Sequence, residues 1–450
     1  MLESVIKLKL TLDEDSQRVL QGQSRICNWL YNRLLERANV LKEQYVKDQN
    51  EDIAKILYSK RGLRNLIPAM KSDHLFLKSV HSSPLKNVGL RLSESIQAYQ
   101  KSRKGLRKGK QTGWPRFRSN KVKPFSLLYD EPGKGFKVSG NSLRISLGVD
   151  EDGKRIYVTA KLEKALHKFP DLEVRQLRIK EELGQFYGIF TIRTEDRPLR
   201  LEIPQKVIAL DPNHKNMSWG VDLEGRSIEI QNPWFMKEIQ KRIDRVKSKR
   251  DKAQKRSRKF TSEHGREYWL PSRRWKHLNQ ILERLHRKRR EQTKTYIFTV
   301  AHYLYQQYDL VSIGDYTPRL ENNDGSLNRN MRREMFNHSL IGRLKNALAW
   351  VAKKAGKEFM EWDEFRSSKT CSYCGEQLPF SLSPDIRTWE CPACQRKLIR
   401  DENAARNGLI WTMKKKNLSL PGSGHLLELS SRCSVRFDGL GLHSVKSGVY

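Results

Sequence analysis

The sequence predicts an α/β fold divided among two or three domains, with a small β-barrel in the first half and a metal-binding module late in the second. Three observations support this prediction. The 450 residues exceed the usual length of one domain and leave ample chain to bury a core. Segments that alternate apolar and polar side chains fill the region from 126 to 194. Two closely spaced pairs of cysteines lie between 371 and 394.

The composition indicates a polyanionic partner inside the cell. Lys and Arg number 87 against 51 Asp and Glu, and nucleic acid is the usual partner of a chain with a net charge of +36. A membrane-surface role is the alternative, but only 37% of the residues are hydrophobic. No apolar run reaches the roughly 18 residues that span a bilayer. The first ten residues alternate Ile6, Leu8 and Leu10 with lysines, unlike a signal peptide. We therefore expect an intracellular protein without a membrane partner.

The first half, residues 1–204, is predicted to hold the barrel. The alternating N-terminal strand and the strands between 126 and 194 could close it, and apolar residues at helical spacing between 13 and 47 predict an amphipathic helix or a helix pair. A basic connector between 97 and 123 contains Arg116, Phe117 and Arg118, which we expect to contact phosphate because few other contacts could hold this backbone. A solvated flexible loop is the alternative.

Residues 205–416 are predicted to form a second domain. Strands at 207–210, 217–221 and 227–230 form an antiparallel meander, and a basic helical stretch follows at 235–305. A strand at 310–313, a helix and a strand at 359–362 complete the order. Residues 417–450 are rich in Ser, Gly and Leu without a period, so we expect a weakly ordered tail. The basic stretch supplies further candidates for nucleic-acid binding: Arg273, Arg274, Lys276, Arg284, Arg287 and Lys288.

The cysteine pairs have the spacing of a zinc site. Cys371 and Cys374 are separated by 16 residues from Cys391 and Cys394, which fits the pattern of two C-x-x-C turns that complete a tetrahedron of sulfur around Zn²⁺. Four thiolates leave no open coordination position, so the zinc is predicted to be structural. Two disulfides or four free thiols are the alternative, and they are rare in an intracellular basic protein.

Acidic residues follow the predicted strands and the cysteine module. Asp211 ends the first strand of the meander, Asp315 follows the strand at 310–313, Glu364 follows the strand near 362, and Asp401 opens a helix. Asp211 could equally belong to an ordinary turn, and Asp401 could be a helix N-cap. If these carboxylates meet at one sheet edge, they could hold two Mg²⁺ ions roughly 3.5–4 Å apart for phosphodiester hydrolysis.

Several stretches resemble the TnpB and Fanzor family of transposon-encoded relatives of type V CRISPR effectors. They are Ala209–Pro212 and Val311–Asp315 for the first two RuvC motifs, Ser367–Gly375 for the entry to a zinc ribbon, and Cys391–Cys394 with Asp401–Asn407 for the third motif. The resemblance implies a wedge-like β-barrel with an inserted helical recognition part at 1–204. It also implies an RNase H-like RuvC domain at 205–416, with a basic helical insertion at 235–305 and a zinc ribbon at 367–400.

One position departs from the common motif. Many family members carry a catalytic Glu where this chain has Gly314, but some relatives have moved it to just before the Ser-Ser-Lys-Thr-Cys stretch, where this chain has Glu364. The resemblance to this rearranged form implies Asp211, Glu364 and Asp401 as the catalytic, magnesium-binding residues, with Asp315 as a helper. A surface carboxylate is the alternative for Glu364.

The resemblance implies an RNA-guided DNA endonuclease that uses structural Zn and catalytic Mg. Its expected partners are a guide RNA and target double-stranded DNA, with one protein copy per RNA, in the nucleus of a eukaryote or the nucleoid and cytoplasm of a bacterium. Gly314 leaves a nuclease-dead RNA-guided DNA-binding repressor as an alternative, and a three-carboxylate site would also suit a transposase-like strand-transfer enzyme. A zinc-containing nucleic-acid-binding module without an active site is a further alternative.

Overall fold

The chain folds as two compact units, Met1–Glu195 and Asp196–Tyr450, which are described separately. This division falls before the predicted boundary at 204, and the roles predicted for the two domains stay predictions. The computed structural model describes residues 2–107, 111–120, 124–166, 173–194, 198–199, 203–262, 265, 267–316, 339–380, 382, 385–419 and 429–445.

The first unit is built on a seven-stranded antiparallel sheet in the order β2-β6-β7-β1-β5-β4-β3. Strand β1 pairs with β7 from Leu2 to Leu10 and reaches β5 only at Leu10 and Thr11. The described strands β2 and β3 stand at the two ends of the order, and closure into a barrel stays a prediction. The strands are β1 Leu2–Thr11, β2 Leu127–Tyr129, β3 Phe136–Ser139, β4 Ser142–Val149, β5 Arg155–Leu162, β6 Glu173–Glu182 and β7 Gln185–Thr194.

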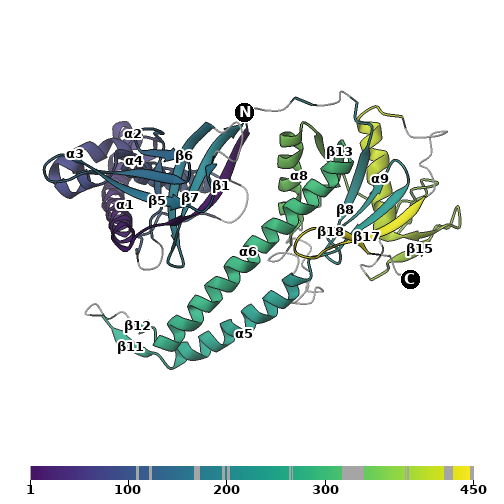
Figure 1. Cartoon of the computed structure of the whole chain (residues 1–450). Helices are drawn as coiled ribbons and strands as arrows, with labels where there is room; N and C mark the ends of the chain where they lie inside the picture. The colour runs from purple at the N-terminus through teal and green to yellow at the C-terminus, as the bar shows by residue number, and fades with distance from the viewer. Residues whose placement is uncertain are drawn as a thin grey trace. The chain divides into compact units, whose positions relative to one another are not determined.

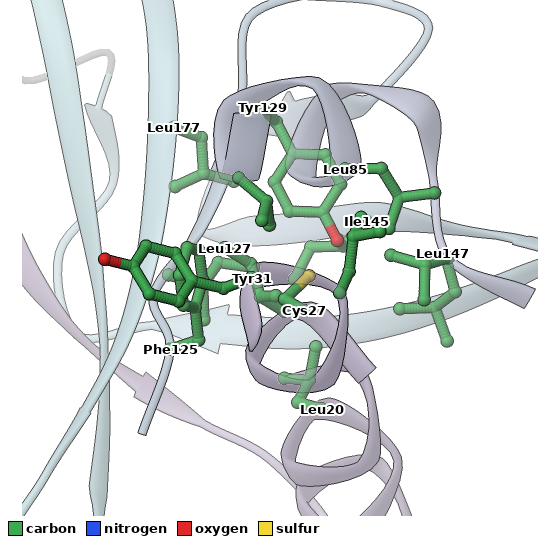
Figure 2. Close-up of a cluster of buried hydrophobic side chains, with 14 of the residues drawn as sticks. Leu20, Cys27, Tyr31, Leu85, Phe125, Leu127, Tyr129, Ile145, Leu147 and Leu177 are labelled. Atoms are coloured by element: carbon green, nitrogen blue, oxygen red, sulfur yellow. The ribbon is translucent and has the colours of Figure 1, made fainter. Parts of the chain in front are cut away.

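Helices cover this sheet and share one apolar core with it. The predicted N-terminal helix is a single element that begins after Asp13, whose carboxylate accepts a hydrogen bond from the Ser16 backbone N–H at 2.7 Å. Figure 2 shows Leu20 and Cys27 of this helix among buried side chains of the sheet. The helical elements are α1 Glu14–Asp48, α2 Glu51–Tyr58, η1 Leu63–Leu66, α3 Ile67–Asp73, η2 Leu75–Ser79 and α4 Ser82–Arg103.

Part of the predicted basic connector is held by α1. The indole N–H of Trp114 donates to Asn39 at 2.8 Å, and the backbone N–H of Arg118 donates to Asn32 at 2.9 Å. The amides of Asn28 and Asn32 both donate to the Arg118 carbonyl at 3.0 Å. The expectation that few contacts hold this backbone is therefore wrong between 114 and 118, and residues 97–103 are the end of α4.

The second unit is built on a mixed seven-stranded sheet in the order β14-β13-β8-β9-β10-β17-β18. The predicted antiparallel meander is confirmed as β8, β9 and β10, and β13 and β14 extend it as strands parallel to β8. The strands are β8 Val207–Pro212, β9 Ser218–Asp222, β10 Arg226–Ile230, β13 Leu310–Gly314, β14 Glu358–Trp362, β17 Ser431–Phe437 and β18 Leu442–Val445.

Helices cover both faces of this sheet. The alternation of side chains along β8 shows the two layers, because Ile208 and Leu210 join the core formed with α6 and α8, whereas Val207 and Ala209 pack with the apolar side of α9. Figure 1 shows α9 beside β8 and the long α5 and α6 side by side. The helices are α5 Phe235–Lys255, α6 Arg273–Gln307, α8 Ile341–Ala355 and α9 Arg400–Lys415.

Two predictions about this unit are wrong. The prediction of a weakly ordered tail is wrong for residues 429–445, because β17 pairs in parallel with β10 and buries Val435 and Phe437 against the core. Residues 420–428 and 446–450 of that tail lie outside the described residues. The basic stretch at 235–305 is not helical throughout, since a two-stranded ribbon, β11 Arg258–Thr261 and β12 Glu267–Leu270, separates α5 from α6. No helix in the described ranges has the length and apolar character that crossing a bilayer requires.

Candidate active site

The acidic residues predicted from sequence gather where three parallel strands end. Strands β8, β13 and β14 run in the same direction, so their carboxyl ends lie at one edge of the sheet. Asp211 is the second-to-last residue of β8, Asp315 follows β13, and Glu364 comes two residues after β14. Asp401 is in the first turn of α9, which packs on β8. Ligand sites of open α/β sheets commonly lie at this edge.

Strand alternation places Asp211 and Gly314 on the face of the sheet that α9 covers. Asp211 continues the series of Val207 and Ala209, which pack against α9. On β13, the Ser312 hydroxyl accepts a hydrogen bond from Thr412 of α9 at 2.8 Å, and Gly314 is the next residue on that side. A side chain at 314 would therefore point toward the same space as Asp211.

Glu364 occupies the space beside Gly314. A Cβ placed on Gly314 would overlap Oε1 of Glu364, so the carboxylate lies where a side chain at 314 would begin. That oxygen is buried and has no hydrogen-bond partner. A buried carboxylate oxygen without a donor is costly, and a bound cation would remove the cost.

Asp401 is oriented by two neighbours. Arg387 of the cysteine module forms an ion pair with its carboxylate at 3.1 Å, and the Asn213 amide donates to it at 3.4 Å. Asp401 is only 8% exposed, and among the described residues no side chain caps the start of α9 with a hydrogen bond. Its carboxylate is therefore held by side chains around the candidate site instead of capping the helix.

Asp315 forms hydrogen bonds with the backbone around Glu364. One of its carboxylate oxygens accepts the backbone N–H of Glu364 at 3.3 Å, and its own N–H donates to the Trp362 carbonyl at 2.9 Å. These contacts fix the chain that carries Glu364. Asp315 is thus positioned to orient Glu364.

Burial and neighbouring charges raise the pKa values of two of these acids, Asp211 and Glu364. Burial raises the pKa of Asp211 well above its usual range, and the charges of Glu364 and Asp401 add to the rise. Burial and then the neighbouring Asp315 raise the pKa of Glu364 to about 7. Carboxyl groups that repel one another at a strand edge are well suited to a divalent cation, which reverses the repulsion.

The three carboxylates are less compact than the cysteines. Among the described residues, Cys371, Cys374, Cys391 and Cys394 are the one group of three or more metal-binding side chains whose ligand atoms all lie within 4.8 Å of one another. The carboxylates share an edge and a face of the sheet, but their oxygens are spread more widely.

The four cysteines form a cluster that could bind a metal ion such as zinc. The sulfur of Cys371 lies 3.7 Å from that of Cys394, and the sulfur of Cys374 lies 3.5 Å from that of Cys391. A tetrahedron with metal–sulfur bonds of about 2.3 Å has edges of about 3.8 Å. Because a disulfide requires about 2.05 Å, these pairs are not bonded to each other.

Tight turns bring the sulfurs together. In the first turn the N–H of Gly375 donates to the Cys371 carbonyl at 2.9 Å, and in the second the N–H of Gln395 donates to the Cys391 carbonyl at 2.8 Å. Gly375 and Gln395 both have a positive φ, 80° and 58°. The second turn joins β15 Thr388–Glu390 to β16 Lys397–Ile399.

Asparagines of α9 attach the cysteine module to the carboxylate site. Asn403 is buried, accepts the backbone N–H of Ser372 at 2.9 Å and donates to the Thr370 carbonyl at 2.8 Å. Asn407 donates to the carbonyls of Ser367 and Thr370 at 2.8 and 2.7 Å. Since Asp401 lies on the same helix, the module and the carboxylate are held in one frame.

Sequence reasoning missed several residues of this site. Arg387 and Asn403 had no distinguishing motif role, although Asn403 belongs to the run that contains Asp401. His214 and Tyr316 also lie here, with Nε2 of His214 3.3 Å from the Tyr316 hydroxyl. Burial and the charge of Glu364 raise the pKa of Tyr316. Their positions just after Asp211 and Asp315 were the available signal.

The residues predicted to bind nucleic acid fall into two groups. Arg116 and Phe117 are exposed, but Arg118 is half-buried with its guanidinium over the rings of Tyr31 and Phe125. It therefore has a packing role in the first unit. On α6 the exposed residues are Arg273, Arg274, Lys276, Arg284 and Lys288, and Arg287 is half-buried.

Comparisons with known proteins agree with the family resemblance. A family model described as Cas12f1-like, TNB domain, matches residues 342–408. A TnpB-like protein of Acanthamoeba polyphaga mimivirus is 31% identical over 140 residues, which are 31% of this chain and 26% of that protein. The CRISPR-associated DNA-binding protein Cas12m of Allomeiothermus silvanus is 27% identical over 136 residues, 30% of this chain and 24% of that protein.

The chain thus spans about a quarter of the length of these relatives. Among solved structures, the Cas12f1–sgRNA–target DNA complex matches with a TM-score of 0.54 at 12% identity, over 90% of this chain and 98% of that one. This likeness concerns the fold. The chain is therefore similar to TnpB-like proteins and type V effectors in sequence, and to Cas12f1 in fold.

Proposed function

We propose that this TnpB-like chain is an RNA-guided DNA endonuclease that hydrolyses phosphodiester bonds with the help of Mg²⁺. The observation that carries the proposal is the position of Glu364. Its carboxylate fills the space beside Gly314, at the strand edge and on the sheet face that Asp211 shares with Asp401. This chain has Gly314 where many family members carry an acid, and a carboxylate from another part of the chain occupies that space.

Asp211, Glu364 and Asp401 would hold the cation. Carboxylate oxygens are the ligands that Mg²⁺ prefers, and the unpartnered Oε1 of Glu364 fits a ligand oxygen. When bound, the metal supplies an activated water and stabilises the oxygen that leaves the phosphate. The residues of the chain fix the geometry, since Arg387 and Asn213 orient Asp401 and Asp315 holds the backbone of Glu364.

The four cysteines would hold a structural Zn²⁺. All four positions of the tetrahedron are taken by sulfur, so no position is open to substrate. The role of the ion would be to fix the two turns. One turn contains Ser372, which is hydrogen-bonded to Asn403. The other turn joins the two strands of the hairpin that follows Arg387.

A guide RNA and target double-stranded DNA are the partners that we propose, in keeping with the Cas12f1 complex whose fold this chain shares. The net charge of +36 supports polyanionic partners. The first unit would act as wedge and recognition domain and the second as an RNase H-like RuvC nuclease. Such partners imply a nuclear or nucleoid location.

A nuclease-dead, RNA-guided DNA-binding protein is the second candidate. A relative named as a DNA-binding protein, Cas12m, matches 30% of the chain at 27% identity. The filled space beside Gly314 favours the nuclease instead. A transposase-like strand-transfer enzyme would use similar carboxylates but would need no RNA.

The test begins with the RNA that copurifies with the full-length protein. One discrete structured RNA is expected, and random RNA would favour the unguided transposase. DNA matched to that RNA is then incubated with the complex and Mg²⁺. Cleavage is expected for the wild type and for Glu361→Ala, an exposed carboxylate of the same stretch. Glu364→Ala should bind the DNA but leave it intact. Binding without cleavage by the wild type would favour the nuclease-dead candidate.

A further inference from the structure

The β11–β12 ribbon carries large apolar side chains in solvent. Phe260, Tyr268, Trp269 and Leu270 are each between 42% and 47% exposed. None of the four belongs to a buried cluster formed by the described residues. Figure 1 shows the ribbon at the end of the paired helices α5 and α6, away from the sheet of the second unit.

Joining the two helices does not require this ribbon. Antiparallel helices are commonly joined by 2–8 residues, whereas here 17 residues from 256 to 272 separate α5 from α6. An isolated two-stranded ribbon is at best marginally stable in water. A segment that is longer than its connecting role requires, and that exposes aromatic rings, is best explained by a binding partner.

The pairing register distributes the rings over both faces of the ribbon. Phe260 is opposite Tyr268, with ring centroids 5.0 Å apart, and shares its face with the pair of Arg258 and Leu270. The other face has Lys259 opposite Trp269, with the ammonium 5.3 Å from the ring centroid. Each face therefore combines a flat ring with a cation.

The charge around the ribbon is strongly positive. Residues 247–276 contain twelve Lys or Arg and three Asp or Glu. The first turn of α6 has no acidic residue, and Arg273, Arg274 and Lys276 lie near its N-terminus, where the helix dipole disfavours cations. An anionic partner would compensate this arrangement, and two copies of the tip would repel each other.

We propose that the ribbon is a base-stacking site for an unpaired strand of nucleic acid. Phosphates would neutralise the cations, and unstacked bases would lie on the rings of Phe260, Tyr268 and Trp269. Duplex bases are already stacked and offer no free face. A membrane surface fits less well, because a segment that lies in a bilayer interface gathers its apolar residues on one face, and here both faces are mixed. The proposal rests on the proposed function only in taking nucleic acid as the class of partner.

Binding of labelled oligouridylate and oligothymidylate to the full-length protein, freed of copurifying RNA, tests the site. The triple variant Phe260→Ala, Tyr268→Ala, Trp269→Ala should bind at least one of the two strands about tenfold more weakly or worse. Comparison of oligouridylate with oligothymidylate shows whether the bound strand is RNA or DNA. The salt dependence of binding should stay unchanged because no cation is removed. The control variant Tyr268→Phe, Trp269→Phe keeps flat rings and should bind like the wild type.

Blunt duplex DNA and vesicles of equal parts phosphatidylserine and phosphatidylcholine complete the design. Duplex binding should be the same for the wild type and the triple variant, and an equal loss on duplex would overturn base stacking. Unchanged affinity for both single strands would also overturn it. A loss confined to vesicle binding, or to self-association seen by light scattering, would assign the ribbon to a membrane or a second copy instead. None of these binding measurements requires DNA cleavage. A protein that stacks bases but does not cut DNA would therefore refute the proposed nuclease activity and leave the base-stacking site in place.

Discussion

The carboxylate of Glu364 lies where Gly314 would carry a side chain, although the two residues are 50 positions apart in the chain. Parallel pairing of β13 with β14 brings them together, with Gly314 opposite Trp362. The small residue and the relocated acid are therefore one arrangement: any side chain at 314 would displace Glu364.

Substitution at Gly314 should act through Glu364. In Gly314→Ala the added methyl group pushes the carboxylate away, and a displacement near 1 Å costs about a hundredfold in rate. DNA binding should be preserved. The single-turnover cleavage rate and the DNA affinity of the same preparation check this. The double variant Gly314→Glu, Glu364→Ala returns the acid to position 314. It should recover part of the cleavage that the single variant Glu364→Ala loses. Wild-type cleavage by Gly314→Ala would show that Glu364 is not used.

The raised pKa of Glu364 predicts a loss of stability with pH in magnesium-free protein. Below its ordinary pKa of 4.5 both the folded and the unfolded states hold the proton. Between 4.5 and about 7 the unfolded chain releases it and the folded protein does not, so the free energy of unfolding falls by on the order of 3 kcal/mol. The pKa of Asp211 is also raised, so its ionisation lowers the free energy of unfolding in the same direction.

Urea unfolding of the second unit, followed from pH 4.5 to 8 without Mg²⁺, measures this loss. Glu364→Gln should fall less steeply and be more stable than the wild type at pH 8, whereas Glu238→Gln, at an exposed position of α5, should behave like the wild type. Mg²⁺ should stabilise the wild type more at pH 8 than at pH 5, because the cation binds the ionised acids. Equal slopes for all three proteins would contradict a protonated Glu364.

Local patterns predicted the parts of the site, but not how they fit together. The cysteine module and the strands before Asp211 and Asp315 follow from spacing and periodicity within short windows. The contact of Glu364 with Gly314 depends on strand pairing between distant segments, and no local pattern encodes it. Arg387 was missed because its partner Asp401 is reached only through the fold of the module.

Two misjudged segments have a related cause. The ribbon at 258–270 lies between long basic helices. Its four-residue strands are too short to be distinguished from those helices by composition. The tail was judged by its Ser and Gly content, although Cys433, Val435 and Phe437 alternate as a half-buried strand requires. The ion pair of Arg432 with the buried Glu402 of α9, at 2.8 Å, further fixes that strand.

The attachment of the cysteine module predicts unequal effects for two asparagines. Asn403→Ala leaves the buried N–H of Ser372 without an acceptor, which costs about 1–3 kcal/mol. Asn407→Ala should cost less, because the carbonyl of Thr370 still receives the Asn403 amide. Zinc loss to a competing chelator and the DNA cleavage rate should both change more in Asn403→Ala. The reverse order would mean that Asn407 is the main attachment.

The two cysteine turns differ at one backbone position, and this difference can be tested directly. Gly375 and Gln395 both have a left-handed φ, which costs an L-residue with a side chain about 1–2 kcal/mol. Gly375→Ala should therefore weaken zinc retention, since it introduces that cost in the first turn. Gln395→Gly removes the cost from the second turn, and the greater freedom of glycine in the unfolded chain offsets only about 0.5–1 kcal/mol of the gain. Zinc release to a chelator should be faster than wild type in Gly375→Ala and unchanged or slower in Gln395→Gly. Faster release from Gln395→Gly would show that the Gln395 side chain stabilises the turn by contacts that outweigh its backbone strain.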